Sequence, residues 1–196
     1  MLICALTREF LIPKIGRQKK GAETVTWVMR NLMRRKIQEG LAAEWLDVGL
    51  ASGLEASGPV DVADLETYGM KLLLPEGEKP NKTGWKRLTD IPVVVLDGDA
   101  GFRRLITDCA QASGVELKIG AECTSYPQAL DLAETCGWAV FVPELWWKRR
   151  KDWVARTQVL PGLKKHQRTL QLGWNRNVAA RRPEVARLVN ALGGKC

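Results

Sequence analysis

The stretch Ile91-Pro-Val-Val-Val-Leu96, followed by the segment 101–113, decides the fold class of this sequence. A continuous apolar run of this length is typical of a strand that is covered on both faces. In the segment that follows, Phe102 and Ile106 recur at helical spacing, and Gly114 is placed to end the helix. A buried strand followed by an amphipathic helix is the repeating unit of α/β folds.

The same alternation along the rest of the chain predicts an α/β fold with mostly parallel sheets. Further strands are predicted at 2–6, 25–29, 46–51, 70–74, 117–119, 139–142 and 170–174. Further helices are predicted from Phe10, over Met33, Ile37 and Leu41, over 129–133 and over 183–192. The acidic stretch 55–64 is predicted to be a loop, and 75–80 to be a crossover between two lobes.

Composition places the chain among soluble globular proteins. Its 196 residues, 45% of them hydrophobic, suffice for a real core. No stretch approaches the ~20 apolar residues of a membrane span, and the N-terminus lacks the pattern of a secretory signal. The five cysteines are odd in number and contain no C-x-x-C pair. Reduced thiols and a cytoplasmic location are therefore predicted, without contact with a membrane.

The net charge of +8 is unevenly distributed. Residues 1–36 carry +7, residues 37–144 carry −10 and residues 145–187 carry +10. If the fold brings the basic ends together, one lobe or face is positive and favours anionic ligands or nucleic acid. A solvated basic surface that keeps the protein soluble is the alternative.

Residue patterns that would indicate catalysis are missing from the sequence, which has no Gly-rich phosphate loop, no H-E-x-x-H and no G-x-S-x-G. His166 is the only histidine, and we place it in a surface loop. Asp97 and Asp99 could serve acid–base chemistry or a metal, but a hydrophilic loop after a buried strand explains them better. We predict no enzyme activity, no catalytic residue, no metal and no cofactor.

The stretch 146–151 mixes two tryptophans with four cations. Single-stranded nucleic-acid binders combine aromatic and basic side chains in this way. An amphipathic helix that packs on its own lobe explains the pattern equally well, so both interpretations stay open.

Several stretches, in order along the chain, resemble the effector-binding domain of LysR-type transcriptional regulators. Phe10-Leu-Ile-Pro-Lys-Ile15 is similar to the L-L-P-x-L that opens the first helix of that family. Residues 38–50 resemble its helix-to-strand segment with the motif G-x-L-D, and 123–143 its helix and strand ending in G-x-G and a proline. The spacer 88–93 resembles the family's L-x-D-L-x-x-x-P, slightly shortened.

Two departures are visible: Ala43-Glu-Trp45 replaces the glycine expected before Leu-Asp, and Cys136-Gly-Trp138 supplies one glycine of two. The resemblance implies two Rossmann-like subdomains joined by crossover strands, in the type 2 periplasmic-binding-protein architecture. Subdomain I would comprise 1–73 and 165–196, and subdomain II would comprise 74–164. A small-molecule effector would bind in the cleft between these lobes.

In the family, polar residues at strand ends and helix starts hold the effector. The matching positions here are Thr7, Arg8, Arg34, Thr124 and Ser125. Because a helix N-terminus favours anions and an arginine can clamp a carboxylate with two hydrogen bonds, we predict an organic acid as effector. The alternative is that the hydroxyl side chains only cap helices and that Arg34 is solvated.

The resemblance also implies partners. We expect a homodimer through the helix that starts near Leu11 and the helix at 101–113. DNA would be bound only through an N-terminal helix-turn-helix domain, which this sequence does not include. Two other functions stay open: a stand-alone solute-binding protein of a transporter, and a nucleic-acid-binding module that uses the basic termini.

Overall fold

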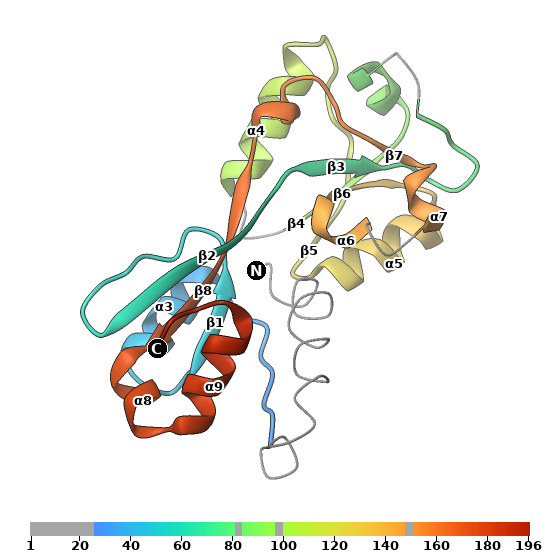
Figure 1. The fold of residues 1–196 in the computed structure, drawn as a ribbon. Coiled ribbons are helices and arrows are strands. Elements are labelled where there is room, and N and C mark those ends of the chain that lie inside the picture. Colours follow the sequence, from blue (N-terminus) through green and yellow to red (C-terminus); the bar gives the residue numbers. More distant parts are fainter. Residues whose placement is uncertain (1–25, 81–83, 97–99, 148–150) are drawn as a thin grey trace. The chain divides into compact units, whose positions relative to one another are not determined.

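The computed structural model describes residues 26–80, 84–96, 100–147 and 151–196, and the chain divides into two compact units (Figure 1). Unit 1 comprises the described residues up to Thr67 together with Arg168–Cys196, and unit 2 comprises Tyr68–Gln167. The sequence analysis predicted that the chain passes from one subdomain to the other at 73/74 and 164/165. The segment 75–80, which we expected to be the crossover, lies inside unit 2.

Unit 1 is an α/β unit whose described strands form a sheet in the order β1–β8–β2. Strand β1 runs antiparallel to β8, with Gly49 opposite Gly173. The elements are α3 (Arg34–Ala42), β1 (Val48–Ala51), β2 (Val60–Tyr68), β8 (Arg168–Asn175), α8 (Arg176–Arg181) and α9 (Pro183–Leu192).

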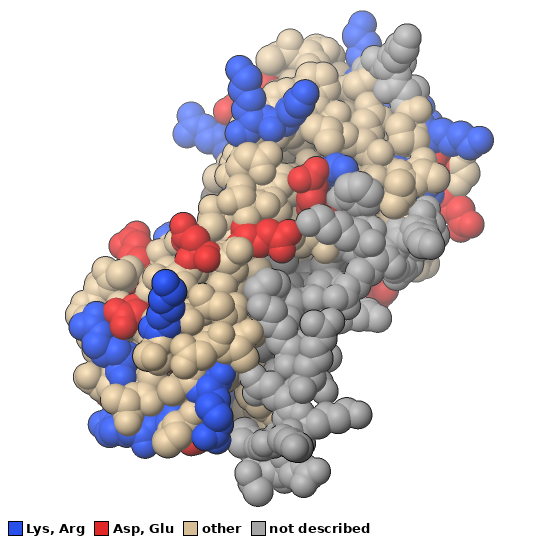
Figure 2. Space-filling view, in the orientation of Figure 1, with Lys and Arg blue, Asp and Glu red and all other residues tan. Residues whose placement is uncertain are grey.

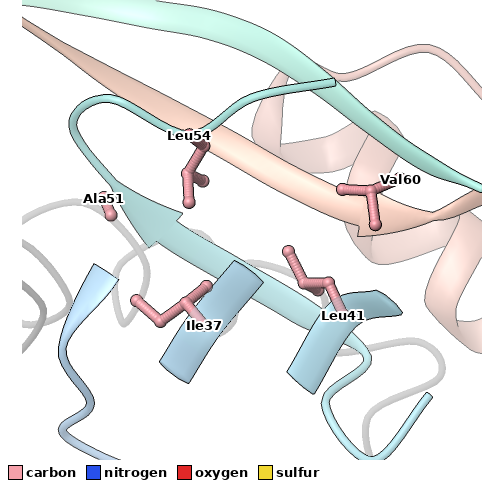
Figure 3. Close-up of a cluster of buried hydrophobic side chains, with 5 residues drawn as sticks. All are labelled: Ile37, Leu41, Ala51, Leu54 and Val60. Atoms are coloured by element: carbon pink, nitrogen blue, oxygen red, sulfur yellow. The ribbon is translucent and has the colours of Figure 1, made fainter. Parts of the chain in front are cut away.

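The two facing glycines allow α3 to pack closely on this sheet. A Cβ atom on Gly49 would lie 2.2 Å from Cγ2 of Ile37, and one on Gly173 would lie 2.8 Å from Cδ1 of Leu41. Ile37 and Leu41, one helical turn apart, belong to a buried apolar cluster that joins the helix to the sheet. Figure 3 shows its members, which are Ile37, Leu41, Ala51, Leu54 and Val60.

Unit 2 has a mixed sheet in the order β5–β4–β6–β3–β7. Strand β4 runs parallel to β5 and β6, and β3 runs antiparallel to β6 and β7. Its strands are β3 (Met70–Leu73), β4 (Val93–Leu96), β5 (Ile119–Cys123), β6 (Ala139–Pro143) and β7 (Thr157–Gln158). Its helices are η3 (Gly84–Thr89), α4 (Ala100–Gln111), α5 (Tyr126–Cys136), α6 (Glu144–Trp147), α7 (Lys151–Val154) and η4 (Leu163–Lys165).

The prediction of an α/β fold is confirmed, but the expected dominance of parallel pairing is wrong for the described strands. The antiparallel pairs involve β3 and β8, which are the first strand of unit 2 and the returning strand of unit 1. Such strands enter a sheet from another part of the chain rather than through a β-α-β crossover, so the right-handed crossover that enforces parallel pairing is missing.

Local predictions were most accurate where the apolar pattern was long and had clear ends. The buried strand at 91–96 is β4, whose first three residues are buried. The closing helix at 183–192 is α9, and Gly193 ends it in the left-handed conformation with φ +104°. The strand at 139–142 is β6, which the structure extends to Pro143.

Three local predictions were wrong or misplaced. The strand expected at 117–119 is β5, which runs from Ile119 to Cys123. Residues 26–29, expected to be a strand, have no regular structure, and Val28 is 72% exposed. High β-propensity alone does not make a strand without a pairing partner. Residues 60–64, expected to be part of a loop, begin β2, in which Asp61 alternates with Val60 and Val62 and forms an ion pair with Arg176.

Three arginines of the basic C-terminal segment form ion pairs with acids of the acidic middle. Arg176 pairs with Asp61, Arg181 with Glu44, and Arg182 with Asp47. Lys and Arg side chains gather over the part of unit 1 formed by α8 and α9, with Asp and Glu side chains beside them (Figure 2). These three ion pairs neutralise part of the basic charge that a nucleic-acid-binding face would need.

None of the helices in the described ranges is both long and apolar enough to cross a membrane.

Candidate functional site

A partly open pocket lies in unit 2 at the carboxyl end of β4. Ligands of α/β proteins bind at the carboxyl ends of parallel strands, so this is the expected edge of the sheet. The pocket is bounded by β4, the start of α4, the first residue of α5 and β6. Its lining residues are Val94, Val95, Leu96, Phe102, Arg103, Ile106, Tyr126 and Phe141.

Aromatic rings form one wall of this pocket. Phe102 of α4 meets Phe141 of β6 edge to face, with ring centroids 5.6 Å apart. Behind Phe141 lies the buried Trp85, whose indole N–H donates to the carbonyl of Pro161 at 2.8 Å. His166, which we placed in a surface loop, is half-buried, and its ring lies 5.7 Å from that of Phe102. These ring contacts fix the start of α4 against the sheet.

A charged pair lies at the same place. The guanidinium of Arg103 forms an ion pair and a hydrogen bond with the carboxylate of Glu122 on β5. The two side chains are 43% and 44% exposed, so solvent screens the pair. Arg103 thus brings a cation to the edge of an otherwise apolar pocket.

The predicted residues Thr124 and Ser125 lie together at the start of α5. Both hydroxyls donate to Oε1 of Gln128 at 3.2 Å. Ser125 is the N-cap residue in extended conformation, but its side chain makes no capping hydrogen bond. The first-turn N–H groups of a helix have no acceptor within the helix, so this end is a place for an external acceptor. The alternative that Ser125 only caps the helix does not describe this geometry.

Cys123 immediately precedes these hydroxyls and ends β5. Burial raises the pKa of its thiol, because the charged form would lose solvation. The thiol is therefore neutral at neutral pH and adds no negative charge beside the start of α5.

Arg34 begins α3 in unit 1, as the sequence predicted. Its side chain is exposed, and Nη1 donates to the carbonyl of Gly53 at 2.8 Å. Nearby, the amide of Gln38 donates to the carbonyl of Glu55 at 2.7 Å, and its oxygen accepts from the N–H of the same residue at 3.2 Å. These bonds fix α3 to the loop after β1.

The predicted site is thus brought together only in part. Thr124 and Ser125 share one hydrogen-bond partner, and Arg34 lies in the other unit. Thr7 and Arg8 lie outside the described residues, as does the predicted dimer helix near Leu11.

Sequence reasoning assigned none of the pocket residues to a site, among them Phe102, Arg103 and Tyr126. The signal for the first two was their place at the start of a helix that follows a buried strand. Tyr126 stands within the stretch 123–143 that carried the resemblance.

No group of three or more His, Cys, Asp or Glu side chains suited to a metal occurs among the residues that the structure describes. Asp97 and Asp99, the pair considered for a metal, lie outside those residues.

Two α/β units, each built on its own sheet and connected twice by the chain, have the architecture of type 2 periplasmic-binding-like proteins. The chain belongs to the LysR substrate binding domain family, whose family model matches residues 2–196. Domains of this family are the effector-sensing parts of transcriptional regulators. A search of curated protein sequences finds no match for this chain.

Solved structures of transcriptional regulators share the fold. The regulatory domain of MexT, a transcriptional activator in Pseudomonas aeruginosa, is 13% identical, with a TM-score of 0.75 over 96% of this chain and 94% of that one. The cofactor-binding domain of the Cbl transcriptional regulator is 14% identical, with a TM-score of 0.70 over 95% and 83%. The LysR family transcriptional regulator CbnR is 15% identical, with a TM-score of 0.66 over 96% of this chain. This chain spans 66% of the length of CbnR.

Proposed function

We propose that this chain is the ligand-sensing part of a LysR-type transcriptional regulator and that its effector is a small organic acid. The observation that carries the anionic part of this proposal is the start of α5, where Thr124 and Ser125 stand beside a helix end that the side chain of Ser125 does not cap. Backbone N–H groups and the helix dipole together stabilise a nearby anion by about 0.3–1 kcal/mol.

The proposed effector contacts are the hydroxyls of Thr124 and Ser125 in unit 2 and the side chains of Thr7, Arg8 and Arg34. To bind a ligand, Arg34 would have to keep or exchange its bond with the carbonyl of Gly53. An exposed guanidinium has five donors, so a carboxylate can be bound while that bond persists.

We further propose that the protein acts in the cytoplasm as a homodimer and reaches DNA through an N-terminal domain of a longer chain. Effector binding would then matter because the ligand prefers one conformation of the sensing domain over another. No step of this mechanism requires a reaction of the effector, so the proposal includes neither catalysis nor a cofactor.

The test is a thermal-shift screen of the 196-residue chain against organic acids, amino acids and neutral analogues. A ligand at 100 times its dissociation constant adds about 2.7 kcal/mol, which for a chain of this size raises the Tm by about 5–10 °C. Ser125→Ala and Arg34→Ala should each reduce the shift. Ser113→Ala, which removes a hydroxyl bonded to the carbonyl of Cys109, and Arg35→Ala are the matched controls.

A ligand whose binding is unchanged in both Ser125→Ala and Arg34→Ala would show that these residues do not form the site. A screen in which acids never shift the Tm, while neutral compounds do, would contradict the anionic effector. Light scattering that shows a monomer at high concentration would contradict the homodimer.

A further inference from the structure

The chain passes between the two units twice, and both crossings are short. The first crossing lies at Thr67/Tyr68, where β2 ends, and Gly69 alone separates β2 from β3. The second crossing lies at Gln167/Arg168, where β8 begins. When two bodies joined in this way change conformation, the change concentrates in the few residues that join them. Contacts that fix the backbone at a crossing therefore limit the motion of the units.

Glu144, the first residue of α6, fixes the backbone immediately after the first crossing. Its carboxylate oxygen Oε2 accepts a hydrogen bond from the N–H of Gly69 at 3.2 Å. Its own N–H donates to the carbonyl of Gly69 at 2.9 Å. Both backbone polar groups of Gly69 are thus bonded to one residue, which is 75 positions away in the sequence.

The strand register explains why this side chain reaches Gly69. Met70 lies opposite Pro143 in the antiparallel pair of β3 and β6, so Gly69 and Glu144 are the next pair of residues. In such a ladder the two residues of a bonded pair exchange both of their N–H···O bonds. Since the chain turns into α6 at Glu144, the carboxylate accepts the second bond in place of the backbone carbonyl.

A buried cation holds the carboxylate in this position. The other carboxylate oxygen of Glu144, Oε1, lies 3.4 Å from Nζ of Lys71, and the two side chains are 33% and 16% exposed. Partly buried pairs are screened by salt less than surface pairs are. One oxygen of Glu144 is therefore directed to Lys71 and the other to Gly69, and we call these contacts the Glu144 clamp.

The space that the clamp occupies exists because residue 69 is a glycine. A Cβ atom at Gly69 would lie 3.1 Å from Oε2 of Glu144 and 3.3 Å from Nε2 of Gln167. Both distances are shorter than ordinary van der Waals contact. Gln167 is the last residue of unit 2 before the second crossing, so the two ends of unit 2 meet at Gly69.

We propose that the Glu144 clamp is a conformational restraint on the first crossing, which confines bending of the chain to the residues before Gly69. For its purpose this inference rests on the proposed function, because a sensing domain can respond to a ligand only if it has distinct conformations whose energies the ligand changes. The clamp would set part of that energy difference. Glu144 is then a positioning residue, and its role requires no contact with a ligand.

The first test is amide hydrogen exchange of the 196-residue chain, followed by NMR at Gly69. Glu144→Ala removes the acceptor of the Gly69 N–H, so this amide should exchange faster by about tenfold or more. Glu144→Gln keeps an oxygen that can accept but loses the charge, so it should give a smaller acceleration. An unchanged exchange rate at Gly69 in Glu144→Ala would overturn the proposal.

The second test measures the distance between the units by electron–electron double resonance. Spin labels are attached at Cys136 on α5 and at Ala191→Cys on α9, both of which are exposed, and the remaining cysteines are replaced by alanine. The distance distribution should be broader in Glu144→Ala than in the chain with Glu144 intact. No effector is present, so the result does not depend on whether the chain senses an organic acid.

The matched control is Glu134→Ala. Glu134 of α5 pairs with Arg156, whose side chain is 16% exposed, as is that of Lys71. Glu134→Ala therefore removes the same charge from a similarly buried cation of unit 2, away from Gly69. It should leave both the distance distribution and the exchange of Gly69 unchanged. Equal broadening in Glu134→Ala and Glu144→Ala would show a general loss of structure and would overturn the proposal.

Gly69→Ala tests the same contact with the carboxylate still present. The added methyl displaces the carboxylate, so the distance distribution should broaden as it does in Glu144→Ala. In the double mutant the broadening should be less than the sum of the two single effects, because both mutations break one contact. Additive effects, or an unchanged distribution in Gly69→Ala, would overturn the proposal. If Glu144→Ala does not fold, Gly69→Ala and Glu144→Gln decide the question.

Discussion

Gly49→Ala tests whether the close approach of α3 to the sheet in unit 1 holds that unit together. The added methyl would lie 2.2 Å from Cγ2 of Ile37, whereas carbon atoms in contact are normally ~3.5–4.0 Å apart. Cγ2 branches directly from Cβ, and a β-branched residue in a helix has essentially one χ1 rotamer, so Ile37 cannot turn away. The helix or the strand must move instead.

The expected destabilisation is that of an overpacked core, about 1–3 kcal/mol. For a chain of this size, that corresponds to a Tm lowered by about 2–12 °C. The assay is urea unfolding followed by tryptophan fluorescence, with the midpoint lowered and the slope unchanged if only the folded state is affected.

A pair of double mutants identifies the clashing atom. Ile37→Leu removes Cγ2, whereas Ile37→Val keeps it and shortens only the other branch. Gly49→Ala combined with Ile37→Leu should therefore be less destabilised than the sum of its single mutants, by about 1 kcal/mol or more. In the double mutant that combines Gly49→Ala with Ile37→Val, the destabilisations of the two single mutants should add. An unchanged midpoint in Gly49→Ala, or equal coupling in both double mutants, would refute this account of the packing.

Two more predictions follow from buried groups. Asn175 is fully buried and caps α8, since its side-chain oxygen accepts from the N–H groups of Asn177 and Val178. Its amide also donates to the carbonyl of Leu41 at 3.0 Å. Asn175→Ala should therefore lower the free energy of unfolding, measured in urea, by about 2–4 kcal/mol, and a loss below about 1 kcal/mol would contradict this account. Burial raises the pKa of the Cys123 thiol, so the stability that this residue contributes is present below the ordinary thiol pKa and is lost as the pH rises above about 8.5. In a background of Cys196→Ala, Cys123→Ala should flatten the alkaline decline of the unfolding free energy, and an identical decline would disprove the assignment.

Much of the fold could be predicted from the sequence where one element is defined by its own residues. The apolar run at 91–96 predicted β4, because a strand that is covered on both faces is apolar throughout. The helical spacing of apolar residues between Pro183 and Gly193 predicted α9, because burial of one face imposes a period on the sequence. The start of α3 at Arg34 and of α5 after Ser125 were found for the same reason. The predictions for residues 26–29 and 60–64 were wrong because strand formation depends on a pairing partner elsewhere in the chain.

For the candidate site, the sequence suggested Thr124 and Ser125 through the resemblance of the stretch 123–143 to the family, and this assignment stays a prediction. It could not show that both hydroxyls turn to Gln128 rather than to the helix end. It also missed Phe102 as a pocket wall, because a buried phenylalanine on a helix has the same pattern whether it faces a filled core or an open pocket.

The sequence by itself determined the α/β class, the elements with strong periodicity and the family, since each depends on patterns of residues close together along the chain. Only the tertiary structure decided that Arg103 pairs with Glu122, that Asn175 bonds to Leu41 134 residues away, and that Gly49 lies beneath Ile37. Contacts of this kind depend on the distance and orientation of packed elements, and hydrophobic spacing fixes which face an element buries but not which atom it meets there.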